Sequence, residues 1–112
     1  MSETSTRDEV MHEVARRIAE AVSPERIVLF GSCARGEMSE HSDIDLFIQV
    51  EPGRDLTEVS RKAYEAIRPL RDRLQRGVDI VVKDSQFVER YGDLVGTVVK
   101  AALEKGKVLY GD

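Results

Sequence analysis

Two aspartates placed two residues apart form the clearest chemical feature of the sequence. Asp43 and Asp45 begin the segment 43–50, in which Ile44 and every second residue after it are apolar. This alternation predicts a strand, and on a strand both carboxylates project from the same face. Like charges held this close are costly unless cations offset them, and Mg²⁺ prefers oxygen ligands, commonly one or two carboxylates. The pair therefore predicts half of a magnesium site, which a triphosphate would complete.

A glycine–serine pair precedes the two aspartates. Gly31 and Ser32 follow directly on the apolar run 27–30, and ten residues separate Ser32 from Asp43. Glycine allows the backbone to approach a ligand closely, and outward-pointing amides at a strand-to-helix corner bind phosphate. Arg35 could add a positive charge to that phosphate, or it could brace the loop. The segment lacks the glycine–lysine pair of a Walker loop.

A third carboxylate lies within the apolar segment 78–82. Asp79 is flanked there by valine and isoleucine, so we expect a strand in which an unpaired buried charge would be expensive. If this strand lies beside that of Asp43 and Asp45, the three carboxylates can share a metal. Asp79 could then accept the proton of an attacking hydroxyl. The alternative is a structural charge paired with an arginine.

Together these residues resemble the signature of the nucleotidyltransferase superfamily that includes DNA polymerase beta. The signature is an apolar residue, Gly-Ser, a spacer and Asp-apolar-Asp-apolar, which residues 30–32 and 43–46 match with a spacer of ten residues. Residues 31–36 and 77–82 are similar to corresponding segments of the minimal nucleotidyltransferases of prokaryotes. The resemblance spans residues 10–110, which is nearly the whole chain.

The resemblance implies a role for each matched residue. Gly31 and Ser32 would hold the triphosphate of ATP or another NTP, and Arg35 lies close to them in the sequence. The three aspartates would be catalytic and would bind two Mg²⁺ ions; they are Asp43, Asp45 and Asp79. The implied reaction is transfer of NMP, with AMP from ATP as the expected case, to a hydroxyl acceptor.

The resemblance also implies a partner protein. Larger relatives append a helical domain that helps to hold the base and the acceptor, and no residue follows Asp112 in this sequence. We therefore expect a separate helical partner of the HEPN type. In such modules the nucleotidyltransferase resembles an antitoxin that transfers AMP to a tyrosine of the toxin. One alternative is a non-catalytic antitoxin or nucleotide-binding module that neutralises its partner by occlusion. Another is a homo-oligomer that completes its own pocket.

The elements that must position these residues follow from the hydrophobic pattern. We expect one domain over residues 1–112, an α/β (α+β) nucleotidyltransferase fold with a small mixed sheet of three to four strands and helices packed against it. Strands are predicted over 27–30, 43–50, 78–82 and 107–110, and helices over 6–22, 56–68, 85–91 and 94–103, in the order α-β-β-α-β-α-α-β. Residues 70–76 are compatible with a helix end or a loop.

Composition narrows the class of protein. The net charge is −4 and the pI is about 5.3, which argues against stable DNA binding because such domains usually carry a basic face. Cys33 is the single cysteine; this excludes an internal disulfide and a thiolate zinc site, and we interpret it as a packed side chain rather than a nucleophile. No leader-like or membrane-spanning apolar stretch is found, so a cytoplasmic location is expected.

A run of arginines has two interpretations. Arg68, Arg71, Arg73 and Arg76 are compatible with a solvated face, which is the simpler interpretation. The alternative is a docking surface for an acidic or RNA partner.

Overall fold

The computed structural model describes residues 3–30, 43–74, 77–91 and 106–111. The helices are α1 (Glu3–Val22), α2 (Leu56–Ile67), the 3₁₀ turn η1 (Arg68–Leu70), α3 (Arg71–Leu74) and α4 (Ser85–Tyr91). The strands are β1 (Arg26–Phe30), β2 (Ile44–Val50), β3 (Val78–Asp84) and β4 (Lys107–Tyr110).

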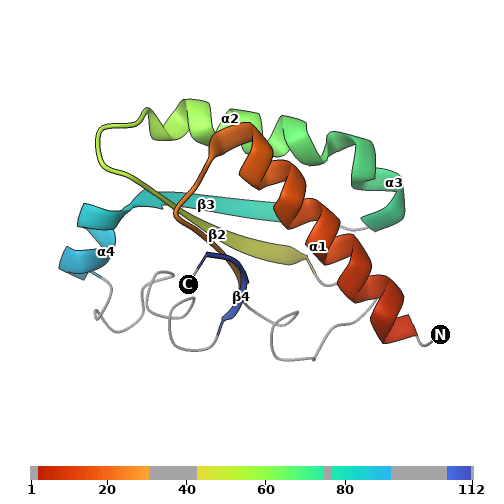
Figure 1. The fold of residues 1–112 in the computed structure, drawn as a ribbon. Coiled ribbons are helices and arrows are strands. Elements are labelled where there is room, and N and C mark those ends of the chain that lie inside the picture. The colour runs from red at the N-terminus through yellow and green to blue at the C-terminus, as the bar shows by residue number, and fades with distance from the viewer. Residues whose placement is uncertain (1–2, 31–42, 75–76, 92–105, 112) are drawn as a thin grey trace.

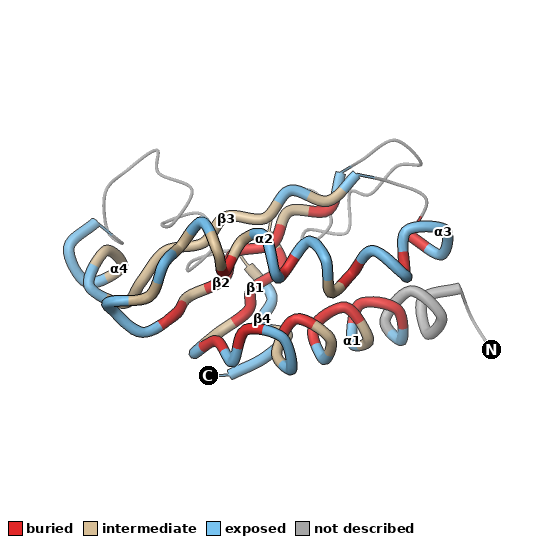
Figure 2. Tube along the Cα trace, turned by 90° about the horizontal axis from the view of Figure 1, so that it is seen from above, coloured by how far each residue is buried: buried red, intermediate tan, exposed pale blue. Residues whose placement is uncertain are grey.

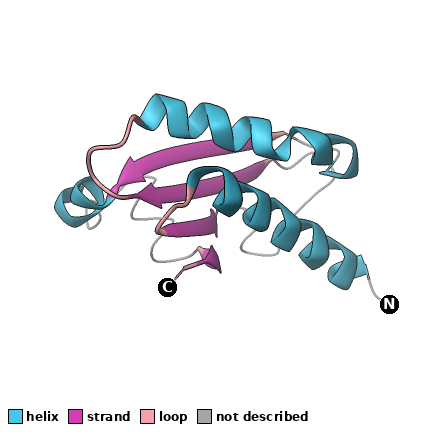
Figure 3. Cartoon of the chain, turned by 45° about the horizontal axis from the view of Figure 1, so that its top comes forward, coloured by secondary structure: helices cyan, strands magenta, loops and turns pink. Residues whose placement is uncertain are grey.

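The four strands form one mixed sheet in the order β3-β2-β1-β4. β1 pairs with β2 and with β4 in antiparallel fashion, whereas β2 and β3 run parallel, as Figure 3 shows by the common direction of their arrows. A parallel pair needs a crossover between its strands, and the segment that contains α2 supplies it. β2 is therefore a central strand with a neighbour on each side.

The two faces of the sheet are covered differently. α1 and α2 lie side by side over one face (Figure 1), where the main core contains Ile18, Ile48 and Ala63. The opposite face has a smaller cluster built on Val28 and Phe47, against which the α4 residues Phe87 and Val88 pack. Figure 2 shows buried positions recurring along α1 and through β1 and β2. The alternation of β2 thus sends its aliphatic residues to the helices and its other residues to the opposite face.

The turn between β2 and α2 fixes the helical layer to the sheet. Gly53 has a φ of +93°, a left-handed angle that glycine adopts without steric cost. Arg54 donates hydrogen bonds to the carbonyl oxygens of Val22 and Ser23, which lack helical partners at the end of α1. The Asp55 carboxylate accepts from the backbone amides of Thr57 and Glu58 at 3.0 and 3.2 Å and so caps α2.

Most of the predicted elements are confirmed. The mixed sheet has four strands, and the short helix after residue 84 and the final strand are both present. α1 begins at Glu3, earlier than predicted, and residues 68–74 are helical turns rather than a loop. The predicted helix over 94–103 lies outside the described residues.

Candidate functional site

The sheet topology brings the three predicted carboxylates to the end of the sheet at which β2 and β3 begin. In the parallel pair Asp45 lies opposite Asp79, and Ile44 lies opposite Val78. Asp43 immediately precedes β2, and the amide of Ile44 donates to the carbonyl oxygen of Gly77 at 2.9 Å. We call Asp43, Asp45 and Asp79 together the carboxylate edge. The expectation that their strands are neighbours is confirmed.

The carboxylates of Asp45 and Asp79 are directed to the face opposite α1 and α2. Phe47 and Val81 lie two residues further along the same strands and belong to the smaller cluster on that face. Side chains alternate between the faces of a sheet, so residues two apart share a face. Phe30, the last residue of β1, pairs with Asp45 from the other side. The start of β2 therefore lies between the start of β3 and the end of β1.

Asp45 carries the electrostatic consequence of this arrangement. Partial burial, and then the negative charges of Asp79 and Asp43, raise the pKa of the Asp45 carboxyl above its usual range. Both causes disfavour an ionised carboxylate. A bound cation would reverse the second cause, since it replaces like-charge repulsion with attraction.

Gly77 has a positional role that the sequence reasoning missed. A Cβ built at Gly77 would lie 2.9 Å from Oδ1 of Asp43 and 3.4 Å from its Cγ. The Asp43 carboxylate thus occupies the space that a side chain at residue 77 would need. The signal was available in the sequence, as a glycine two residues before the Asp79 carboxylate, but only the strand pairing shows what the glycine makes room for.

The donor set fits a hard divalent cation. All of the donors at the carboxylate edge are carboxylate oxygens, and Mg²⁺ usually takes one or two carboxylates together with water and substrate phosphate. Within residues 3–30, 43–74, 77–91 and 106–111, no group of three or more His, Cys, Asp or Glu side chains is placed to hold a metal ion. Asp43, Asp45 and Asp79 are among those residues, so as placed they do not form a complete ligand set for a metal ion.

The remaining predicted site residues have different outcomes. Gly31, Ser32 and Arg35 lie outside the described residues, so their contact with a nucleotide stays a prediction. Asp79 is exposed on β3, which is an edge strand. The argument that Asp79 needs a partner because it is buried was therefore wrong, although its position beside Asp45 was predicted correctly.

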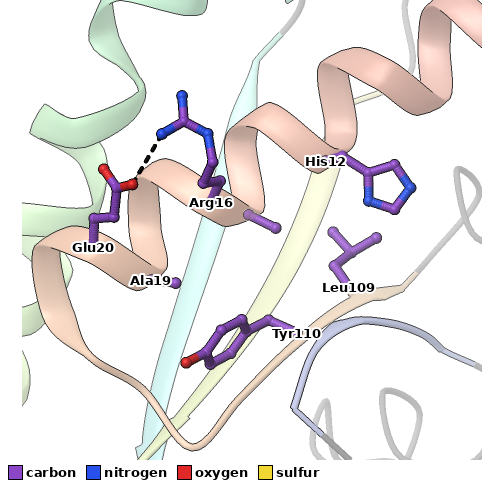
Figure 4. A pocket seen from close by; sticks show the side chains of 7 residues that line it. His12, Arg16, Ala19, Glu20, Leu109 and Tyr110 are labelled. Atoms are coloured by element: carbon purple, nitrogen blue, oxygen red, sulfur yellow. Dashed lines mark hydrogen bonds and ion pairs between the residues drawn. The ribbon is translucent and has the colours of Figure 1, made fainter.

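A hollow lies away from the carboxylate edge, between α1 and β4 (Figure 4). It measures about 400 Å³ and is lined by His12, Ala15, Arg16, Ala19, Glu20, Leu109 and Tyr110. Its one carboxylate, Glu20, accepts a hydrogen bond from Arg16 at 2.9 Å. The described lining thus has one acidic group that is already paired, in contrast with the carboxylate edge.

Comparison with known proteins identifies the family of the chain. The nucleotidyltransferase domain family matches residues 11–109. A protein of Methanocaldococcus jannaschii named as a candidate protein adenylyltransferase is 32% identical over 78 residues, which cover 67% of this chain and 80% of the relative. The chain belongs to the nucleotidyltransferase domain family, and its prediction as a nucleotidyltransferase is confirmed.

Solved structures confirm the nucleotidyltransferase fold. A mutant form of the MntA–HpeT toxin–antitoxin superposes with a TM-score of 0.61 at 20% identity, covering 91% of this chain and 73% of that chain. A toxin–antitoxin crystallised with AMP-PNP has a TM-score of 0.57 at 23% identity, covering 90% of this chain and 73% of that chain.

Among the described helices, none is long and apolar enough to cross a membrane.

The raised pKa of Asp45 predicts a stabilising substitution. An aspartate whose pKa is higher in the folded chain than in the unfolded chain destabilises the fold when ionised, and this penalty disappears as pH falls through the raised pKa. Asp45→Asn should therefore raise Tm by about 2–4 °C near pH 7 in metal-free buffer. The gain should shrink toward zero near pH 4, as measured by thermal unfolding across that range. The control is Glu51→Gln, which removes an exposed carboxylate just beyond the far end of β2. Equal changes in Tm for the two variants would contradict the interpretation that Asp45 is repelled by Asp43 and Asp79.

Gly77→Ala tests whether the space beside Asp43 matters. The new methyl group should displace the Asp43 carboxylate and weaken Mg·ATP binding by about tenfold, measured as a Kd by titration. Tm should not fall, since the backbone at Gly77 is not in the left-handed region. Gly53→Ala is the matched control, because its φ of +93° predicts a lower Tm with unchanged Mg·ATP affinity. An unchanged Kd in Gly77→Ala would count against a role for Asp43 in binding.

Proposed function

We propose that this nucleotidyltransferase transfers AMP from ATP to a hydroxyl group of a partner protein. The observation that carries the proposal is the pairing of Asp45 with Asp79 across β2 and β3, with Asp43 near enough to raise the pKa of Asp45. The name of the Methanocaldococcus jannaschii relative supports a protein acceptor. The neighbour crystallised with AMP-PNP supports an adenine nucleotide.

The proposed chemistry is an in-line displacement at the α-phosphate. The acceptor oxygen forms a bond to the α-phosphorus while the bond between that phosphorus and the bridging oxygen breaks, so that pyrophosphate leaves. Asp79 accepts the proton of the acceptor hydroxyl; it is exposed and therefore open to an incoming substrate. Gly31 and Ser32, with Arg35, hold the triphosphate from the end of β1.

Asp43, Asp45 and Asp79 would hold Mg²⁺ between the protein and the triphosphate. When bound, Mg²⁺ supplies the positive charge that polarises the phosphate oxygens and steadies the developing charge. The chain itself contributes orientation, because the paired strands hold Asp45 and Asp79 at a constant separation while the nucleotide binds. The negative charges of Asp79 and Asp43 also raise the pKa of Asp45. A bound cation would offset this repulsion, so the three carboxylates would favour cation binding.

The partner that we propose is a helical protein of the HEPN type, with a tyrosine as the acceptor. The toxin–antitoxin neighbours support a partner protein, without indicating its fold or its acceptor residue. In such a pair the chain would be the antitoxin, acting as a single domain in the cytoplasm, where ATP and Mg²⁺ are both supplied.

The direct test is incubation with Mg²⁺, α-labelled ATP and the protein that co-purifies from the native host. We expect label on one tyrosine of the partner, located by mass spectrometry. Asp79→Asn should lower the rate by about 10²–10⁴-fold, the usual contribution of a general base. The double variant Asp43→Ala, Asp45→Ala should show no transfer while remaining folded, since removal of like charges costs no packing.

Glu51→Gln again serves as the control, because it changes a carboxylate without touching the carboxylate edge. Transfer by this variant should equal that of the unmodified protein. If the double aspartate variant still neutralises the partner in cells, the chain acts by occlusion and the proposal is wrong. Label that stays in ATP with every acceptor would contradict it equally.

A further inference from the structure

Three arginines lie between the end of α2 and the start of β3. Arg68 is in η1, and Arg71 and Arg73 are in α3; we call these three the arginine cluster. All three are exposed. Within the described parts of the chain, none of them forms an ion pair. Arg76, which the sequence groups with them, lies outside the described residues.

Two other helical arginines, Arg16 and Arg61, are neutralised locally. Arg16 pairs with Glu13 and Glu20, the latter at 2.9 Å. Arg61 pairs with Glu58 and Glu65, the latter at 2.8 Å. These pairs join residues three or four positions apart on one helix, where they lie on the same face. The arginine cluster lacks such local glutamate partners among the described residues, on a protein of net charge −4.

Two members of the arginine cluster, Arg68 and Arg71, line a cavity that adjoins the carboxylate edge. The cavity measures about 610 Å³ and is lined by Arg68, Pro69, Arg71, Asp72 and Gly77. The described lining contains two guanidinium groups and one carboxylate, that of Asp72, so positive charge predominates there. Gly77 is also the residue whose Cβ position lies 2.9 Å from Oδ1 of Asp43. The cationic cavity and the carboxylate edge thus meet at this glycine, and Figure 1 shows α3 beside the end of the sheet where β3 begins.

The cavity lies on one particular flank of the carboxylate edge. β2 has β3 on one side and β1 on the other. Gly77 leads into β3 and Asp79, whereas Phe30 pairs with Asp45 from β1 and directly precedes Gly31 in the sequence. The nucleotide phosphates are expected on the β1 flank, so the β3 flank is left for the acceptor, beside the carboxylate that receives its proton.

We propose that the arginine cluster binds an acidic segment of the partner protein and thereby presents its acceptor hydroxyl to Asp79. This inference rests on the proposed function, because it assigns the acceptor side of that same site. Guanidinium groups match carboxylates in a fork geometry that a lysine does not reproduce. A polynucleotide is disfavoured as the occupant, since nucleic-acid footprints usually accompany a basic domain and this chain has a pI of about 5.3.

Binding and transfer should be measured separately with defined probes. The probes are a fluorescent random copolymer of glutamate and tyrosine, a lysine–tyrosine copolymer of equal length and a single-stranded oligonucleotide. We expect the unmodified protein to bind the acidic copolymer in preference to the other two. The variant Arg68→Ala, Arg71→Ala should weaken this binding by about tenfold, and added salt should reduce the difference.

The affinity for Mg·ATP should stay within about twofold of the unmodified value, because two arginines on the acceptor flank do not touch the nucleotide. Arg61→Ala is the matched control, since that arginine is exposed but paired with glutamates, and it should not change copolymer binding. The variant Arg68→Lys, Arg71→Lys keeps both positive charges but lacks the planar guanidinium groups. It should recover only part of the affinity for the acidic copolymer.

Several results would overturn the inference. Equal binding of the acidic copolymer by the double variant, or no binding by either protein, would exclude a role in protein recognition. Preference for the oligonucleotide would assign the cluster to nucleic acid, and a matching loss of Mg·ATP affinity would assign it to the nucleotide. Arginine-dependent binding of the acidic copolymer, together with no transfer of label to the co-purifying partner, would leave the acidic docking site intact and reject the transferase proposal instead.

Discussion

The register between β2 and β3 is the constraint on which the site depends. It sets Asp45 opposite Asp79, and because side chains alternate between faces, a slip of one residue would send one carboxylate into the helical core. The register is held by the apolar partners that surround this pair, with Leu46 opposite Ile80 on the helical face and Phe47 opposite Val81 on the other. Hydrophobic burial thus holds together two like charges that would otherwise separate.

This arrangement has an energetic cost in the free protein. The raised pKa of Asp45 records the cost as partial burial and repulsion from Asp79 and Asp43. A cation that enters with a triphosphate would offset the repulsion among the carboxylates, and this would add to the free energy of binding.

Much of the fold and part of the site could be predicted from the sequence. The alternation in 43–50 indicated correctly which side chains of β2 face the helices, and Asp79 was placed beside Asp45. The burial of Asp79 was predicted wrongly, because an apolar run does not distinguish a central strand from an edge strand whose outer side is open. The role of Gly77 needed the pairing with residue 44, which is a tertiary fact. The arginine run gained meaning only when Gly77 was found to join its cavity to Asp43.

The central claim is that the carboxylate edge binds divalent cations together with a nucleotide. The most direct measurement is a Mn²⁺ titration followed by electron paramagnetic resonance, with and without a non-hydrolysable ATP analogue. We predict two bound Mn²⁺ ions per chain in the presence of the nucleotide, and the loss of at least one of them in Asp45→Asn. Mn²⁺ that stays free in the unmodified protein, or that binds equally in the variant, would contradict the claim.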